Sequence, residues 1–560
     1  MLRSLVRVLG ATLVVGVVGL VVPARPAHAD ETSTADKLRI LYSSRFTVTD
    51  DGLPLVTVEV MSGQERVTLS APGGLVILPD GDGGSATRID GANSITVTSQ
   101  DAAPAEIREW TVVERLAPDD ASGIATGMET WRSRGLDPHS FEIGTLFAVD
   151  GEVIDTREHL VAVAPVGPGK GAAKAKQIAD VHDVVTTVHR ELVRRPRGTI
   201  VARAGDVTVM NPSVVWFRPA RAGDTITVKD VPTNTGGSQL VTGHEDRRYW
   251  GAVYVTFGSD GALTAVNAVG EDKLLAGLVP SEIFADAPEA ALEAQAIAAR
   301  TELLEKIGRR NLTEPYLLCS TQQCQVYAGA GKEHPRTTRA VEKTRGIVML
   351  RDGGGLVDAR YSASAGGRTE DNEAIWGGTP DPSLRGRADT VDKKLAERFA
   401  VIDDKNLDAF LAASPGAFWS GSTKWGKKHF RWTLESSAKE LSAHVARVHA
   451  SVGTVTALEV VRRGRSGRIQ SIRIRGTKGV AVTDGDLAIR RLLGGLKSTL
   501  FTVEARGPAG APTKFVFRGA GFGHGVGMDQ VGAIGMADAG KPHEAILGNY
   551  YRGMHLHRLY

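Results

Sequence analysis

The chain is poor in cysteine and in net charge, and each shortage excludes a class of protein. Only two of its 560 residues are cysteine, so a small fold held together by many disulfides is excluded. The formal net charge is only +3, which gives no indication of a nucleic-acid partner. Hydrophobic residues make up 42% of the chain, enough to build packed cores in about two to four domains.

Long apolar runs are also scarce, and the one present lies near the N-terminus. A basic start is followed by an uncharged run from Val8 to Val22 and by the small-residue pattern Ala27-His28-Ala29. This order predicts that residues 1–29 are a secretory signal peptide, cleaved before Asp30. The run has about fifteen residues, whereas a membrane span needs roughly twenty. We therefore expect a secreted or cell-envelope protein, in the periplasm or cell wall, with an uncleaved anchor as the alternative.

The two cysteines, Cys319 and Cys324, are close together in "LLCSTQQCQVY". In an oxidising compartment an isolated pair favours a local disulfide, and two reduced thiols are the alternative. A tetrahedral zinc site would need two more ligands, and this loop contains no histidine. The sequence therefore predicts a disulfide, no bound metal and no other cofactor.

The pattern of the chain changes along its length and predicts an α+β fold. Short runs that alternate apolar and polar residues, such as "LVTVEVMSG" and "SITVTSQ", predict a β-rich region over residues 30–135. Residues 136–242 suggest a small α/β accessory region, with a connecting loop at "GPGKGAAKAK", residues 167–176. Residues 243–560 are expected to form a mixed α/β domain.

The segment "GLVPSEIFADAPEAALEAQAIAARTELLEKIG" predicts a buried helix preceded by a short loop that carries Glu282. Asp286 and Glu289 have the spacing of a capping box, and Gly308 suits the C-terminal end of the helix. The many alanines would let neighbouring backbone approach closely. Arg300 is unusual in such a helix: it must pair with a carboxylate or with carbonyl groups, or else extend to water.

Two later segments are rich in glycine and in polar residues. In "GLVDARYSASAGGRTEDNEAIWGG", a strand ending at Tyr361 leads to a Gly-Gly pair and to Trp376, which could stack on a sugar or simply pack in a turn. In "RGAGFGHGVGMDQVGAIGMADAGKPHEAILGNYYRG", the glycine spacing does not fit a phosphate-binding loop. His524 lies between glycines, where it could face a site or be structural. A small-residue helix is predicted from about Asp529 to Ala539.

These segments, in this order, resemble the SpoIID/LytB family, which contains the stage II sporulation protein D lytic transglycosylases and the amidase-enhancer proteins. The resemblance covers roughly residues 249–559 and rests on "SEIFADAPEAALEAQAIAART", "CQVYAG", "ARYSASAGGRTE", "IWGG" and "GFGHGVGMDQVGAIGMADAGKPHEAILGNYYRG". It implies that Glu282 is the catalytic acid of an enzyme that cleaves the bond between N-acetylmuramic acid and N-acetylglucosamine without water. The product would carry a 1,6-anhydro end.

The resemblance also implies a substrate groove in the SpoIID-like domain and names its partners. The residues expected to line the groove, on motif position alone, are Arg300, Tyr361, Thr369, Glu370, His524 and Gln530. Glu370 is also the nearest candidate for a second carboxylate. The expected ligands are peptidoglycan glycan strands. Two alternatives remain open: a non-catalytic, glycan-binding enhancer of an N-acetylmuramoyl-L-alanine amidase, and a structural envelope protein.

The chain departs from the family pattern at several positions near these motifs. Ile283-Phe284 replace the usual Met-Pro after the glutamate, Glu302 replaces a tyrosine, and Tyr361 stands before the serine-glycine turn where histidine is usual. Gln323 replaces a histidine beside the second cysteine, which removes a possible zinc ligand.

A general acid must be protonated near neutral pH, and this sets a condition on Glu282. Its pKa would have to lie about two units above the usual value of roughly 4.3, which corresponds to about 2.7 kcal/mol. The N-terminus of the following helix would favour the charged form, so burial against Ile283 and Phe284 must outweigh it.

We expect the secreted protein to carry the Cys319–Cys324 disulfide and no stoichiometric metal. Because the closed loop is short, reducing the bond should lower the free energy of unfolding by no more than about 2 kcal/mol, measured by denaturant titration with and without reductant. Elemental analysis that found one zinc per chain would contradict this prediction.

Overall fold

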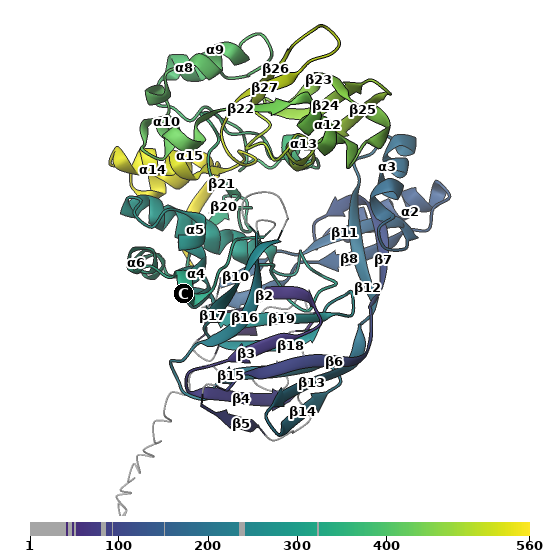
Figure 1. Ribbon diagram of the computed structural model, residues 1–560, viewed down its shortest axis with the longest axis vertical. Coiled ribbons are helices and arrows are strands. Elements are labelled where there is room, and N and C mark those ends of the chain that lie inside the picture. Colours follow the sequence, from purple (N-terminus) through teal and green to yellow (C-terminus); the bar gives the residue numbers. More distant parts are fainter. Residues whose placement is uncertain are drawn as a thin grey trace, which may run out of the picture.

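The computed structural model describes residues 41–42, 47–49, 52–79, 86–91, 93–149, 152–234, 241–321 and 324–560. The predicted signal peptide, residues 1–29, lies outside the described residues. Within the described part, no helix is both long enough and apolar enough to cross a membrane. Strands dominate the N-terminal part, and helices and strands mix in the rest, which confirms the predicted α+β fold class (Figure 1).

Two antiparallel sheets pack against each other at the base of the molecule in Figure 1. The first has seven strands in the order β1-β2-β19-β18-β15-β4-β5, with bounds Thr47–Val48, Pro54–Gln64, Leu263–Gly270, Ala252–Phe257, Val214–Pro219, Gly74–Pro79 and Thr87–Asp90. The second has six in the order β14-β13-β6-β3-β16-β17, with bounds Val207–Asn211, Arg197–Ala204, Ile95–Ala103, Val67–Ser70, Ile226–Asn234 and Val241–Tyr249.

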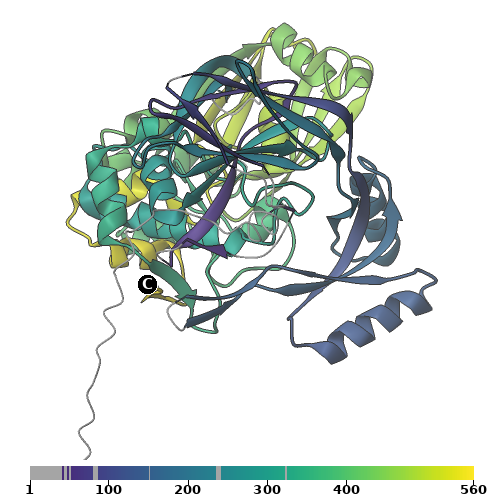
Figure 2. The same cartoon turned by 90° about the horizontal axis from the view of Figure 1, so that it is seen from below.

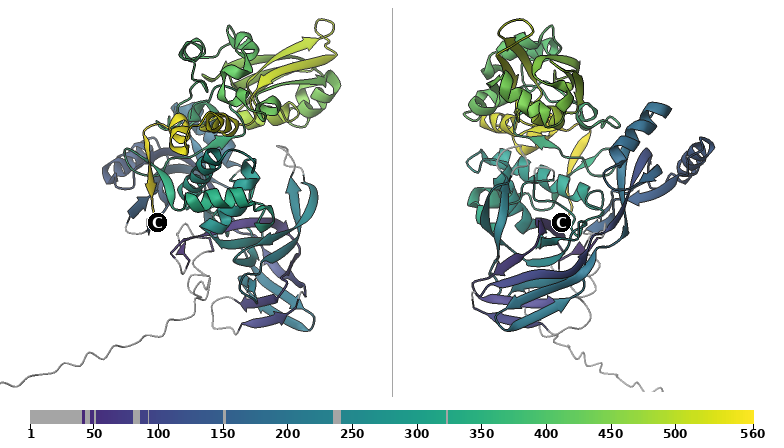
Figure 3. Two further views of the ribbon diagram at one scale, coloured as in Figure 1. Left: turned by 90° about the vertical axis from the view of Figure 1, so that its left-hand side faces the viewer. Right: turned by 45° about the vertical axis from the view of Figure 1, so that its right-hand side comes forward.

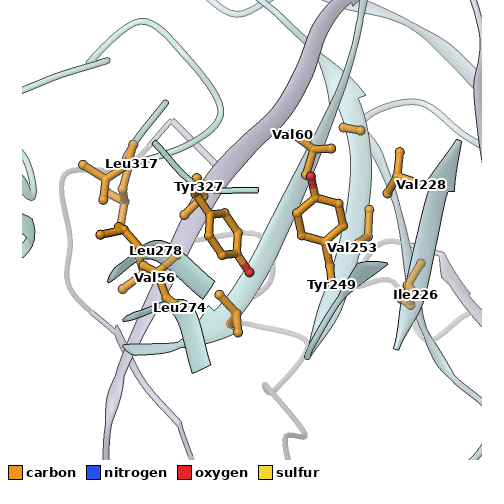
Figure 4. Packing of buried hydrophobic residues seen from close by; sticks show 14 of the residues in the cluster. Val56, Val60, Ile226, Val228, Tyr249, Val253, Leu274, Leu278, Leu317 and Tyr327 are labelled. Atoms are coloured by element: carbon orange, nitrogen blue, oxygen red, sulfur yellow. The ribbon is translucent and has the colours of Figure 1, made fainter. Parts of the chain in front are cut away.

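Alternation along each strand explains how the seven-stranded sheet is buried on both faces. In β15, Val215 and Phe217 face the core between the two sheets, whereas Val214 and Trp216 belong to a second apolar cluster on the opposite face. Successive side chains of a strand point to opposite faces, so one apolar strand serves both cores. The main core continues from these strands into the adjacent helix α4 (Glu271–Glu282), where Leu274 joins it (Figure 4).

A separate four-stranded sheet, in the order β12-β7-β11-β8, forms the accessory region at the side of the molecule (Figure 2). The four strands, in this order, are Thr187–Arg194, Glu106–Leu116, Glu158–Val166 and His139–Ile143. Two helices, α2 (Ala121–Ser133) and α3 (Gly171–His182), cover one face of this sheet. The hairpin β9–β10 (Leu146–Val149, Glu152–Asp155) follows β8.

The loop predicted over residues 167–176 is wrong in its second half, because α3 begins at Gly171. Alanine and lysine are good helix formers, and α3 buries Ala175 and Ile178 on one side. Ile178 packs in the same cluster as Trp131 of α2, which explains why the segment is helical despite its glycines.

The predicted boundary at residue 243 separates strands that share one sheet. β18 and β19 follow this residue, yet they pair with β15 and β2 of the N-terminal part. The seven-stranded sheet thus extends across the predicted boundary, and the division into domains stays a prediction.

The helix that follows α4 is the centre of the remaining fold. Helix α5 (Glu289–Lys306) is almost wholly buried and contacts α4 (Glu271–Glu282), α6 (Pro335–Lys343) and β20 (Ile347–Arg351). The C-terminal part of the chain returns to α5: β29 pairs with β20, and α14 and α15 pack on the helix (Figure 3). Their bounds are Met554–Arg558, Gln530–Asp538 and His543–Tyr550.

The intervening chain builds the upper body in Figure 1, which contains two three-stranded sheets. These are β22-β27-β26 (Arg431–Ser437, Lys514–Ala520, Phe501–Arg506) and β23-β24-β25 (Val455–Arg463, Ile469–Gly476, Val480–Asp484). The helices are α7 Asn372–Trp376, α8 Lys393–Arg398, α9 Leu407–Ala412, α10 Trp419–Ser422, α11 Gly426–His429, α12 Ala438–Ala446 and α13 Asp486–Leu492. Short 3-10 turns occur at Ala330–Lys332, Pro415–Ala417 and Ala450–Val452.

A buried ion pair fixes α5 to α4. Arg300 and Glu271 are both fully buried, with 2.6 Å between Nε and Oε1. The guanidinium also donates to the carbonyl groups of Thr344 and Ile347, and the Tyr560 hydroxyl donates to the second oxygen of Glu271. All of the charge is thus compensated inside the protein, as burial requires.

Replacing Arg300 is expected to destabilise the fold strongly. Arg300→Ala leaves Glu271 buried without its counter-charge, so the free energy of unfolding should fall by about 3–5 kcal/mol in urea titrations. The matched control is Lys176→Ala, which breaks an exposed pair with Asp180 and should cost less than about 1 kcal/mol. Equal losses in the two variants would contradict this view of Arg300.

Candidate functional site

Glu282 is the last residue of helix α4, not a loop residue as predicted. The helix continues through Pro280 because Leu278 and Val279 are buried in the main core and hold the last turn in place. Ile283 follows in an extended conformation and donates its N–H to the Val279 carbonyl oxygen. The carboxyl group of Glu282 therefore projects from the C-terminal end of a helix.

The predicted capping box at the start of α5 is also wrong. The helix begins at Glu289 after Pro288, and no side chain caps its first turn. The Asp286 carboxylate instead lies 2.9 Å from the Lys424 ammonium group, an interaction with the upper body that the sequence spacing could not show. The predicted end is confirmed, because Gly308 follows the last turn with a φ of +74°.

The half-buried Glu282 carboxyl is held by a backbone donor. Its Oε1 accepts a hydrogen bond of 2.6 Å from the N–H of Val326. Just before Val326, Cys319 and Cys324 are joined in a disulfide, and the Cys319 N–H lies 3.0 Å from the Cys324 sulfur. The disulfide thus lies two residues before the backbone donor of Glu282. Among the residues that the structure describes, no group of three or more His, Cys, Asp or Glu side chains could hold a metal ion.

Three glutamines and a tyrosine form hydrogen bonds beside Glu282. Gln530 donates through Nε2 to the Glu282 carbonyl oxygen at 3.0 Å and to Gln295 Oε1 at 3.1 Å. The Tyr361 hydroxyl donates to Gln325 Oε1 at 3.1 Å. The sequence predictions for Glu282, Tyr361 and Gln530 therefore fall in one polar cluster, although they come from distant parts of the chain.

The environment of Glu282 favours its protonated form. Burial and, to a smaller extent, the nearby Glu302 carboxylate raise the pKa of this carboxyl to about 7, although the Val326 hydrogen bond acts in the opposite direction. The C-terminal end of α4 carries partial negative charge, which also disfavours a carboxylate there. The sequence had suggested the reverse helix effect, because it placed Glu282 ahead of α5 and not at the end of α4.

Glu302 stands where the family usually has a tyrosine, and its effect on the pKa of Glu282 was not predicted from the sequence. It is 6% exposed and lies 3.8 Å from the Arg360 guanidinium. Burial raises the pKa of its carboxyl, while Lys306 and Arg360 lower it. Gln295 and Glu302 are seven residues apart and so share one face of α5, a spacing that could have linked them in advance.

His524 faces Trp376 on a second side of the site region. The two rings have centroids 4.9 Å apart, and the Arg360 guanidinium lies 4.9 Å from the centre of the Trp376 ring. His524 Nδ1 accepts the N–H of Val526, and burial together with Arg360 lowers the pKa of the ring to about 3. His524 is therefore neutral near pH 7. Trp376 is 48% exposed, so part of its ring is open to a ligand.

Three of the residues predicted to line a groove lie inside the protein instead. Arg300 is fully buried in its pair with Glu271, and so it cannot contact a substrate. Thr369 is buried and exchanges hydrogen bonds with the backbone of Arg387. Each role is structural, because every polar group is already matched within the fold.

Glu370 is likewise buried and does not join the cluster around Glu282. Its carboxylate accepts hydrogen bonds from the Ser466 hydroxyl at 2.7 Å and from the Asp371 N–H at 3.0 Å. The Ser466 contact comes from the turn between β23 and β24, which no motif connects to Glu370. The prediction of Glu370 as a substrate-binding residue is therefore not supported.

Comparison with known families and proteins places this geometry in context. Residues 259–350 match a family model described as "Stage II sporulation protein", and residues 370–527 match one described as "Domain of unknown function (DUF8618)". The first segment contains Glu282, Gln295 and Val326, whereas Tyr361 and Gln530 lie outside both. The site thus combines the SpoIID segment with chain that follows it.

The chain is also similar to curated bacterial proteins. It is 30% identical over 300 residues to the amidase enhancer of Bacillus subtilis (strain 168), a match that covers 50% of this chain and 39% of that protein. It is 25% identical over 297 residues to the stage II sporulation protein D of Bacillus amyloliquefaciens and 27% identical over 296 residues to that of Bacillus subtilis. Each of these two matches covers 50% of this chain and 73% of the relative.

These matches and the motifs support a SpoIID/LytB family protein. The match to the amidase enhancer spans well under two thirds of that protein's length.

Glu282→Gln is expected to remove a pH dependence of stability. With a pKa of about 7 in the folded chain and 4.5 as the reference, Glu282 takes up a proton on folding at any pH between these values. Wild-type stability should therefore fall as the pH rises from 4.5 to 7, by about 3 kcal/mol, and the glutamine variant should escape this loss.

Urea titrations at pH 4 and pH 8 measure the difference in unfolding free energy between variant and wild type. This difference, variant minus wild type, should be about 3 kcal/mol larger at pH 8 than at pH 4. The exposed Glu129→Gln serves as control and should follow the wild type at both pH values. A Glu282→Gln difference that stays constant between the two pH values would show that the carboxyl is not perturbed.

Proposed function

We propose that the chain is a secreted peptidoglycan lytic transglycosylase with Glu282 as its single acid and base. The observation that carries this proposal is a half-buried carboxyl with a pKa of about 7, held by Val326 in a cluster of glutamines and a tyrosine. At neutral pH such a group is populated in both protonation states, which one residue acting first as acid and then as base requires. Its place within the SpoIID segment supports the same proposal.

The proposed reaction balances with one carboxyl group. Protonated Glu282 gives its proton to the glycosidic oxygen while the bond from that oxygen to C1 of the muramyl residue breaks. The resulting carboxylate takes the proton of the muramyl 6-hydroxyl as O6 bonds to C1. The products are a free 4-hydroxyl on N-acetylglucosamine and a 1,6-anhydromuramyl end, and Glu282 regains its proton.

The neighbouring carboxylates favour this reaction over hydrolysis. A glycoside hydrolase normally uses a second carboxyl group to activate water or to attack the sugar. Glu370 is buried and bonded to Ser466, and Glu302 is buried beside Arg360. Neither is placed to serve as that second group.

Tyr361, Gln530 and His524 are proposed to line the glycan groove around Glu282. Gln530 fixes the backbone of Glu282, and burial, followed by the Glu282 charge, raises the pKa of the Tyr361 hydroxyl well above its usual range. The Tyr361 hydroxyl donates to Gln325, so its oxygen can accept a hydrogen bond from a sugar hydroxyl, and a neutral histidine can donate one to a sugar oxygen.

A second candidate function is that of a glycan-binding protein that enhances a cell-wall amidase. The similarity to the amidase enhancer of Bacillus subtilis favours it. The same groove could then bind glycan strands without cleaving them, and the chain would contact an amidase as partner.

Glu282→Gln separates the two functions. The amide keeps the size of the side chain but cannot pass a proton to the leaving oxygen, so turnover of glycan strands freed of stem peptides should fall by at least about 100-fold. Mass spectrometry of 1,6-anhydromuramyl products measures the turnover. The wild-type rate should also fall about tenfold for each pH unit above pH 7, as the acid form is depleted.

Binding of intact strands should change little in this variant, because the amide still occupies the groove, and Glu129→Gln should retain full turnover. If wild type makes no anhydro ends, and both wild type and Glu282→Gln stimulate an amidase equally, the enhancer function replaces the enzyme. Equal cleavage by both forms would place the acid elsewhere.

A further inference from the structure

Two aspartates meet inside the protein at the start of helix α14. Asp529 is the residue before the helix, and Asp389 lies in the chain between α7 and α8. Both are fully buried. The Gly532 N–H donates to Asp529 Oδ1 at 2.9 Å, and a Cβ atom placed on Gly532 would lie 2.9 and 3.0 Å from the two Asp389 oxygens. The two carboxyl groups therefore face the same residue and share one buried site.

Each carboxyl group joins separate segments of the chain. Asp529 Oδ2 accepts the N–H of Ala365 at 2.8 Å, which connects the start of α14 to the turn that contains this alanine. Asp389 accepts the Tyr550 hydroxyl of α15 at 2.7 Å and the Ser420 N–H of α10 at 3.2 Å. Four segments are thus held together through these two carboxyl groups.

No cation neutralises the pair directly. Besides Tyr550, the titratable or charged groups that face it are Arg387 and Arg468. The Arg387 guanidinium donates to the Asn549 carbonyl and that of Arg468 to the Ala365 carbonyl, both at 2.9 Å. Within the part of the chain that the structure describes, neither aspartate forms an ion pair. Two carboxylates that share a buried site without a paired cation repel each other, so they are not both charged.

The surroundings favour one proton on the pair. Burial raises the pKa of Asp529 well above its usual range, and the Asp389 charge raises it further. Burial also raises the pKa of Asp389, although the hydrogen bonds from Tyr550 and Ser420 act in the opposite direction. With one proton bound, the pair carries a single negative charge, which the four hydrogen-bond donors around it can stabilise.

Gln530 connects the pair to the candidate site. It follows Asp529 directly as the first residue of α14, and its side chain donates to the Glu282 carbonyl oxygen at 3.0 Å and to Gln295 Oε1 at 3.1 Å. Asp529 caps the first turn of α14, so a change at this cap changes the position of Gln530.

We propose that Asp389 and Asp529 together hold a single proton in the folded protein at neutral pH, and that loss of this proton at higher pH opens the first turn of α14 and releases Gln530 from Glu282. Both aspartates are positioning residues that act through Gln530. The inference goes beyond the proposed function, because it concerns the protein without a ligand and does not require that the chain cleaves glycan.

The direction of the pH effect follows from the number of bound protons. When the first turn of α14 opens, the two carboxyl groups become hydrated and ionise at pH values above their usual pKa, so that opening releases the proton. The equilibrium constant for opening therefore rises about tenfold per pH unit, from about pH 5 up to the pKa of the closed pair.

Hydrogen exchange of the full-length protein, followed by mass spectrometry without any substrate, tests this proposal. Between pH 6 and pH 8, the protection factor of the α14 amides should fall at least about tenfold in wild type, whereas that of the α12 amides should stay constant. Asp389→Asn keeps the size of the side chain and removes its charge, so Asp529 should ionise in the closed protein. The α14 protection factor should then change by less than about threefold.

Asp529→Asn removes the other charge and should abolish the pH dependence in the same way. Asp408→Asn, at an exposed position in α9, is the matched control and should keep the pH dependence of wild type. If Asp389→Asn alters the circular dichroism spectrum, Asp529→Asn decides between the outcomes.

Three results would overturn the proposal. The first is a wild-type protection factor of α14 that does not change between pH 6 and pH 8. The second is a fall that persists in both asparagine variants, which would assign the proton to another group, such as Glu282. The third is an equal fall in α14 and α12, which would show global unfolding and not local opening. Absence of glycan cleavage, in contrast, would contradict the proposed enzyme and leave this inference standing.

Discussion

The burial of helix α5 is the constraint on which the rest of the SpoIID part depends. A helix that is covered on nearly every side must find a partner for each polar side chain it carries, because an unmatched polar group inside a protein is costly. In α5, Gln295 meets Gln530, Arg300 meets Glu271, and Glu302 lies beside Arg360. Each match fixes another element against the helix, and the alanines between them let those elements come close. The polar cluster at Glu282 is one result of this packing.

The same helix also connects the candidate site to the accessory region. At its C-terminal end, Lys306 pairs with Glu305 and with Asp358, and Arg309 pairs with Glu305 and with Glu158 of β11. Asp358 in turn pairs with Arg360, which lies against Trp376. The charges therefore form a continuous series from the accessory sheet to the rim of the site. The position of the accessory sheet is thereby set by the helix that shapes the surroundings of Glu282.

Secondary structure that follows from local sequence patterns was predictable from the sequence, whereas contacts between distant loops were not. The α+β class, the end of α5 at Gly308 and the start of α14 after Asp529 follow from alternation, glycine and capping chemistry, which act over a few residues. The motifs also gave Glu282, Tyr361 and Gln530 as members of one site. In contrast, the Val326 donor and the Ser466 partner of Glu370 come from turns whose place is decided by tertiary packing. Arg300 and Gln295 are both polar residues in one buried helix, and only the fold shows that the first pairs with Glu271 while the second contacts Gln530.

The two-residue parallel bridge between β21 (Tyr361–Ser362) and β28 (Met528–Asp529) has a consequence for how the molecule forms. Everything in the upper body lies in sequence between these two short strands, so Glu282 and Gln530 meet only across a very long stretch of chain. Contacts of such large sequence separation form slowly, because the entropy of closing the loop is lost before the contact is gained. During synthesis, the segment bearing Glu282 leaves the ribosome well before the segment that completes its surroundings. The surroundings of the Glu282 carboxyl are therefore completed late, after the upper body between the two strands has been synthesised.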